Sequence, residues 1–148
     1  DQKFISEDRV RMHDTDAAGI LYFARLFRFV HDALEAFMEN AGISFKDLFR
    51  RKDVDFTFVI VHTEGDYFQP LKIGDKLTIH TSVKAIGETS FSLFYEIYKE
   101  DKTLAASANT IHVTLDKKTK QKKAVPIMLK KKMENYVSST REGSHEDI

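Results

Sequence analysis

The sequence of 148 residues lacks cysteine and tryptophan, has only two prolines, and carries no excess of charge. The absence of cysteine excludes disulfides, thiolate zinc sites and a cysteine nucleophile. With 23 basic and 23 acidic residues the formal net charge is zero, which gives no support to a nucleic-acid partner. No apolar run approaches the roughly 18 residues of a membrane span, and no charged-then-apolar leader opens the chain. We therefore expect a cytoplasmic protein without a membrane span.

The composition is that of a folded globular chain. Hydrophobic residues make up 42% and charged residues 31%, a balance that argues against disorder. Twelve phenylalanines and five tyrosines indicate a core built largely on phenyl rings. The length suits a single domain, which we expect over residues 1–137, followed by a polar, flexible tail over 138–148.

The clearest periodic segment spans residues 23–41. Its apolar residues follow the i, i+3, i+4, i+7 spacing of a helix with one apolar stripe. Turn-forming residues over 13–19 precede it, and Gly42 stands where a left-handed C-terminal cap would lie. Arg28 and Asp32 are four apart on the polar side, a spacing that allows a weak ion pair.

Strand-like alternation predicts an antiparallel sheet. In the first strand Phe4, Val10 and Met12 are expected on one face. Short turns join the later strands into a meander, and Pro126 suits the first position of a short final helix. The expected strands are 4–12, 56–68, 76–86, 91–97 and 104–115. An α+β fold follows, in which a sheet of about five strands curls around the long helix 23–41.

Common catalytic motifs are missing from the sequence. It contains no G-x-S-x-G, no H-E-x-x-H, no Walker loop and no G-x-G-x-x-G. The six histidines form no i, i+4 pair. We therefore expect neither a metal site nor a cofactor.

The remaining candidate is Asp14-x-Asp16-x-x-Gly19, directly before the long helix. It can be an ordinary turn in which a carboxylate accepts backbone N–H bonds and complements the helix dipole. It can also be catalytic, because N–H donors at a helix start can hold a carbonyl oxygen as it gains negative charge. A carboxylate beside them could attack the carbonyl carbon or activate water. Spacing alone leaves both interpretations open.

Ten residues at this point read Asp14-Thr15-Asp16-Ala17-Ala18-Gly19-Ile20-Leu21-Tyr22-Phe23. This segment resembles the signature of the hotdog-fold acyl-CoA thioesterases of the 4-hydroxybenzoyl-CoA thioesterase family. The resemblance continues through Val61-His62, Asp66-Tyr67-Phe68 and His112-Val113 and covers most of residues 4–136. Within that family the chain is most similar to the 1,4-dihydroxy-2-naphthoyl-CoA thioesterases of phylloquinone and menaquinone synthesis.

The resemblance implies a sheet wrapped on a central helix and a homodimer or homotetramer with its active sites between subunits. It implies that Asp16 is the nucleophile or general base, that the backbone N–H near Phe23 polarises the thioester carbonyl, and that Gly19 leaves room for the substrate. Tyr22 could line the acyl pocket. His62 is either an ordinary polar strand residue whose hydrogen bonds are satisfied or a residue of the pocket near an aromatic acyl group. Asp14 is expected to support the turn rather than to react.

The expected activity is therefore hydrolysis of an acyl-CoA to the free acid and CoA, with 1,4-dihydroxy-2-naphthoyl as the best acyl group. The alternatives are a general short-chain or fatty acyl-CoA thioesterase and a non-catalytic acyl-CoA-binding protein. Eight lysines lie between residues 117 and 132. They form either a solvated surface or a cationic surface for the CoA phosphates.

Overall fold

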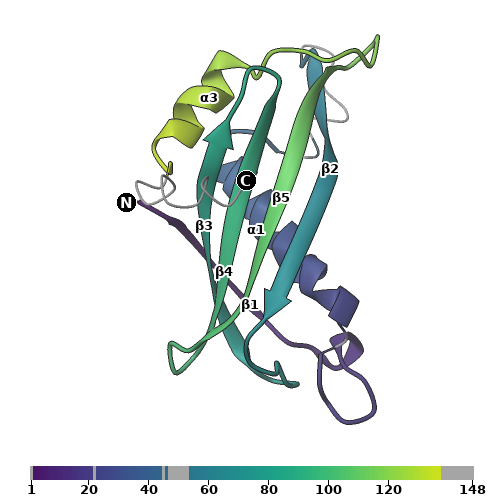
Figure 1. Cartoon of the computed structure of the whole chain (residues 1–148), viewed down its shortest axis with the longest axis vertical. Helices are drawn as coiled ribbons and strands as arrows, with labels where there is room; N and C mark the ends of the chain where they lie inside the picture. The colour runs from purple at the N-terminus through teal and green to yellow at the C-terminus, as the bar shows by residue number, and fades with distance from the viewer. Residues whose placement is uncertain (1, 22, 45, 47–53, 138–148) are drawn as a thin grey trace.

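One long helix lies against a curved antiparallel sheet in the computed structural model, which describes residues 2–21, 23–44, 46 and 54–137 (Figure 1). The helix is α1 (Leu26–Asn40), and a short helix α3 (Ile127–Glu134) lies near β3. The strands are β1 (Phe4–Arg9), β2 (Phe56–Tyr67), β3 (Lys76–Ile86), β4 (Ser90–Lys99) and β5 (Leu104–Asp116). The predicted α+β architecture is confirmed.

The sheet order is β1-β3-β4-β5-β2, and all neighbouring strands are antiparallel. The predicted meander over β3, β4 and β5 is confirmed. β2 pairs with β5 instead of β3, so the chain crosses from one edge of the sheet toward the other between β2 and β3. A bulge between Ile60 and His62 interrupts the register of β2 against β5.

The core lies between α1 and the facing side of the sheet. Phe37 of α1 makes edge-on contacts with Phe4 at 5.8 Å and with Tyr136 at 5.3 Å between ring centroids. Phe29 and Met38 are completely buried in the same layer. Burial of each such side chain contributes about 1.5–3 kcal/mol to stability. The apolar stripe of α1 is therefore the main contact that holds the helix against the sheet.

The end of α1 has the predicted glycine cap. Gly42 adopts a φ of +86°, which L side chains rarely adopt. Its N–H donates to the Glu39 carbonyl at 3.0 Å, and the Ile43 N–H donates to the Met38 carbonyl at 2.8 Å. These two bonds form a Schellman motif that satisfies the last helical carbonyls.

Element boundaries differ from the prediction at the N-terminal side. The first strand ends at Arg9, and a 3-10 turn, η1 (Met12–Asp14), follows. Met12 is therefore 77% exposed, whereas Val10 is fully buried, so the prediction that Met12 shares a strand face with Val10 was wrong. The helix begins at Leu26 instead of residue 23, after a second 3-10 turn, η2 (Phe23–Arg25). The expected tail 138–148 lies outside the described residues.

Candidate active site

Asp16 lies in a tight loop, residues 14–21, between η1 and α1; we call this segment the Asp16 loop. One carboxylate oxygen, Oδ1, accepts the N–H groups of Ala18 at 2.8 Å and Ile20 at 3.2 Å. The Gly19 N–H donates to the Asp16 carbonyl at 3.0 Å, and Gly19 has a φ of +77°. The loop thus orients the Asp16 carboxylate through its own backbone and leaves Oδ2 without a bond to the described residues.

The far end of the Asp16 loop is attached to the connection between β2 and β3. The Leu21 N–H donates to the Leu71 carbonyl at 2.8 Å, and the Ile73 N–H donates to the Gly19 carbonyl at 2.9 Å. A Cβ on Gly19 would lie 3.6 Å from Cγ2 of Ile73, an ordinary contact. The positive φ, and not a lack of space, therefore requires glycine here.

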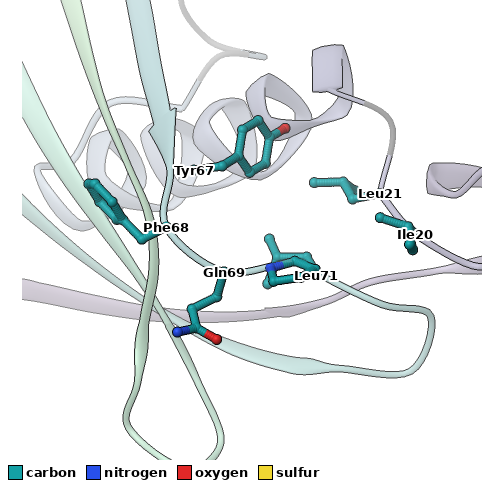
Figure 2. Close-up of a pocket in the computed structure, with 7 residues that line it drawn as sticks. Ile20, Leu21, Tyr67, Phe68, Gln69 and Leu71 are labelled. Carbon is teal, nitrogen blue, oxygen red and sulfur yellow. The ribbon is translucent and has the colours of Figure 1, made fainter.

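A cavity of about 350 Å³ opens between the Asp16 loop and the end of β2 (Figure 2). Ile20, whose N–H binds the Asp16 carboxylate, is one of its walls. The other lining residues are Leu21, Tyr67, Phe68, Gln69, Pro70 and Leu71. Most of this lining is apolar, and a cavity of this size and character suits a small organic group.

Tyr67 connects the cavity with the start of α1. Figure 2 shows its ring beside the helix, with Leu21 and Ile20 nearby. Burial raises the pKa of Tyr67 to about 12, although a backbone hydrogen bond with Leu26 opposes the rise. The hydroxyl therefore stays neutral at physiological pH. Its hydrogen bond with the backbone of Leu26 links the cavity wall to the first residue of α1.

Gly65, two residues earlier on the same face of β2, allows this close packing. A Cβ at this position would lie only 2.6 Å from Cδ2 of Leu26 and 3.2 Å from the Ser107 carbonyl oxygen. Only glycine lets the beginning of α1 rest directly on β2.

Asp14 is fully buried and bound on both oxygens. The Arg28 side chain donates from Nε to Oδ1 at 2.8 Å and from Nη2 to Oδ2 at 2.6 Å, and the Arg11 N–H donates to Oδ2 at 2.9 Å. Burial opposes ionisation, but the hydrogen bonds from Arg28 and Arg11 outweigh it and hold the pKa of Asp14 below its usual value. A carboxylate saturated in this way supports the turn and is not available to react.

His62 lies apart from the Asp16 loop within one chain. It pairs with the exposed Ile111, whereas its neighbour Thr63 pairs with the buried Thr110 on the α1 side. Paired residues of antiparallel strands share a face, so His62 points away from α1. Its side chain is 52% exposed, with Nε2 3.5 Å from Oε1 of Glu64.

The remaining predicted residues are only partly visible. Tyr22 lies outside the described residues, as does the side chain of Phe23. The backbone of Phe23 opens η2, two residues after the end of the Asp16 loop. The structure therefore brings Asp16, Gly19 and the Phe23 backbone into one segment and leaves His62 elsewhere. Sequence reasoning named Tyr67 only as part of the segment Asp66-Tyr67-Phe68, without a role. It missed Gly65 and the link from Arg28 to Asp14.

Two absences apply to the described part of the chain. There, no group of three histidine, aspartate or glutamate side chains is placed to hold a metal ion. None of the described helices is both long and apolar enough to cross a membrane.

Comparison with known proteins agrees with this geometry. Residues 10–133 match the family described as the thioesterase-like superfamily. A 1,4-dihydroxy-2-naphthoyl-CoA hydrolase of Rippkaea orientalis is 38% identical over 115 residues, which are 76% of this chain and 82% of the relative. The enzyme of the same name from Microcystis aeruginosa is 35% identical over 92% of this chain and 96% of the relative.

A solved structure shows the same architecture. The crystal structure of a 1,4-dihydroxy-2-naphthoyl-CoA thioesterase from Synechocystis superposes with a TM-score of 0.80 at 28% identity, covering 89% of this chain and 96% of that one. The hotdog fold expected from the sequence motif is therefore confirmed.

Proposed function

Because the chain belongs to the thioesterase-like superfamily, we propose that it hydrolyses 1,4-dihydroxy-2-naphthoyl-CoA to the free acid and CoA, with Asp16 as nucleophile or general base. Thioester hydrolysis is the activity that its relatives carry in their names. The observation that carries the role of Asp16 is its carboxylate, fixed by two backbone N–H groups beside an apolar cavity and just before a helix start.

In the proposed reaction the thioester carbonyl lies against the N–H groups that begin η2 and α1. These donors stabilise the oxyanion that forms when the carbonyl carbon is attacked. If Asp16 attacks, an acyl anhydride forms, the carbon–sulfur bond breaks, and CoA leaves as a thiolate that takes a proton from water. Water then cleaves the anhydride. If Asp16 instead acts as a general base, it takes the proton of the attacking water.

The cavity favours an aromatic acyl group. Phe68 and Tyr67 supply rings, and Leu21 and Leu71 supply aliphatic walls. A flat bicyclic ring gains most by leaving water against such surfaces. A general short-chain or fatty acyl-CoA thioesterase remains the second candidate, because the same apolar lining accepts an alkyl chain.

The proposal includes a homodimer or homotetramer in the cytoplasm. β2 forms one edge of the described sheet, and its side chains Val59 and Val61 are 43% and 57% exposed. Unpaired edges allow a strand of a second copy to pair with them.

The lysine-rich connection between β5 and α3 lies at the opposite end of the molecule from the Asp16 loop (Figure 1). Lysines that hold the CoA phosphates of a substrate at Asp16 would thus come from a second copy.

The test is thiol release, followed with a disulfide dye. The panel contains 1,4-dihydroxy-2-naphthoyl-CoA, 4-hydroxybenzoyl-CoA, benzoyl-CoA, and short and long fatty acyl-CoAs. Asp16→Asn should lower turnover by about 10²- to 10⁴-fold and remain folded. Asp101→Asn, the same substitution in the exposed turn between β4 and β5, is the matched control and should keep wild-type turnover.

Preference for the naphthoyl ester, lost in Asp16→Asn, supports the proposal. Similar rates on all esters favour the general thioesterase. Binding without thiol release favours a non-catalytic acyl-CoA-binding protein. Unchanged turnover in Asp16→Asn refutes the assigned role of Asp16.

A further inference from the structure

Arg28 contacts three separate segments with a single guanidinium group. Besides the two bonds to Asp14, Nη1 donates to Oδ2 of Asp32 at 2.9 Å, and Nη2 donates to the Arg9 carbonyl at 3.1 Å. Nη1 also lies 3.6 Å from Oδ1 of Asp8, and the guanidinium carbon lies 4.4 Å from the centre of the Phe29 ring. The predicted ion pair with Asp32 is confirmed, but it is only one part of this arrangement.

The position of Arg28 makes the bonds to Asp14 mechanically important. Arg28 is the third residue of α1, so it moves with the helix start. Asp14 begins the Asp16 loop and lies two residues before Asp16. One bidentate contact therefore joins the two parts of the proposed site, the helix start and the loop that carries the carboxylate.

We propose that Arg28 is a positioning residue, which sets where Asp16 stands relative to the start of α1 by holding Asp14. This inference rests on the proposed role of Asp16. The other end of the Asp16 loop is already attached to Leu71 and Ile73 by backbone bonds. At the Asp14 end, the N–H groups of Asp14 and Thr15 donate to the carbonyls of Arg11 and Met12 in the preceding turn. The side chain of Asp14 is what joins this end to α1, through its two bonds from Arg28.

Stability alone is a poor explanation for this contact. Asp14 has no exposed surface, and removing a carboxylate from water costs most of what its ion pair returns. A buried bidentate pair also fixes geometry, because the planar guanidinium group donates both hydrogen bonds to the carboxylate in one orientation. Reacting groups need such precision, because a displacement of about 1 Å can lower the rate about 10²-fold.

The experiment compares Arg28→Lys and Asp14→Asn with Asp32→Asn, each in the full chain. Arg28→Lys keeps the positive charge among the carboxylates but loses the fork. Asp32→Asn removes an exposed partner of Arg28 that does not touch the Asp16 loop. For the ester that the wild type hydrolyses fastest, kcat should fall about 10²-fold in the first two variants, with KM within about threefold of wild type. Asp32→Asn should keep wild-type kcat.

Amide hydrogen exchange supplies a readout that does not need activity. The Ala18 and Ile20 amides, which bind the Asp16 carboxylate, should exchange faster in Arg28→Lys, while those of Ile79 and Leu93 in the sheet remain as protected as in the wild type. A protein that only lost stability would exchange faster everywhere.

Wild-type kcat and exchange in a folded Arg28→Lys or Asp14→Asn variant would overturn the inference. Failure of both variants to fold would overturn it as well, because the contact would then serve the fold. The parallel Asp16→Asn measurement separates the two proposals. If that variant is inactive while Arg28→Lys keeps full kcat, only the positioning role fails; if Asp16→Asn keeps full turnover, the role of Asp16 fails first.

Discussion

His112 gives a prediction about how stability depends on pH. Its ring is fully buried, stacked on Phe91 at 4.7 Å and edge-on to Phe58 at 5.5 Å between centroids. Nε2 lies 2.8 Å from Oγ1 of Thr110, whereas Nδ1 has no hydrogen-bond partner among the described residues. Burial, together with a smaller effect of the His31 charge, lowers the pKa of His112 to about 4.

The size of the effect follows from the two protonation states. An unfolded histidine titrates near pH 6.5, so between about pH 6.5 and 4 the unfolded chain binds a proton that the folded chain refuses. Stability is then full above pH 6.5 and is lost as the pH falls through this window. Between pH 7.5 and 4.5 the loss from this one residue is about 2.5 kcal/mol.

Asp8 acts in the opposite direction over nearly the same window. Burial and a hydrogen bond with Asp32 raise the pKa of Asp8 to about 6, against the opposing effects of the Arg9 N–H and the Arg28 charge. A raised carboxyl pKa means that the folded chain holds the extra proton, so this contribution weakens as the pH rises from about 4 to 6. The effects of His112 and Asp8 on the pH dependence of stability therefore largely cancel in the wild type.

Single substitutions should expose each slope. In His112→Phe the ring contacts remain and the buried titration disappears, so the unfolding free energy relative to wild type should rise by about 2.5 kcal/mol between pH 7.5 and 4.5. Asp8→Asn should show the reverse trend, gaining about 1–2 kcal/mol relative to wild type as the pH rises from 4.5 to 7.5. Urea unfolding at four pH values measures both. If the free energy of unfolding depends on pH in the same way for His112→Phe and wild type, His112 is not the source of the predicted loss of stability at low pH.

Four further substitutions test the site and the packing around it. Gly65→Ala should lower the free energy of unfolding by about 1–3 kcal/mol, because its Cβ would meet Cδ2 of Leu26 at 2.6 Å; unchanged urea midpoints would contradict the packing argument. Gly19→Ala and Gly42→Ala, at φ values of +77° and +86°, should each cost about 1 kcal/mol, but only Gly19→Ala should also lower turnover. Phe68→Ser, at a side chain 55% exposed at the cavity, should raise KM for aromatic esters while leaving the unfolding midpoint within error, and an unchanged KM would remove Phe68 from the binding surface.

The main elements were predictable because their patterns are local. The 3.6-residue period of α1 and the alternation in β3, β4 and β5 need no distant partner to be recognised. The cap at Gly42 is equally local, since a glycine following the last apolar residue of a helix usually marks its end. These features could be assigned from neighbouring residues alone.

Long-range contacts could not be assigned in this way. Arg28 and Asp14 are fourteen residues apart, and neither helix nor strand periodicity relates them. The nearer Asp32 satisfied the expected i, i+4 pair, so nothing in the sequence called for a second partner. The pairing of β2 with β5 is likewise set by the whole sheet and not by the turn that follows β2.

The bulge in β2 explains why alternation in the sequence predicts the wrong face for His62, and it also shapes the site. Strict alternation from Phe58 and Ile60 would turn His62 toward α1. One extra residue in the strand reverses every later side chain, and Gly65 and Tyr67 then face the helix instead. Gly65 gives Leu26 room to approach, and Tyr67 forms a wall of the cavity. The irregularity that alternation cannot foresee is thus what brings the start of α1 onto β2 beside the Asp16 loop.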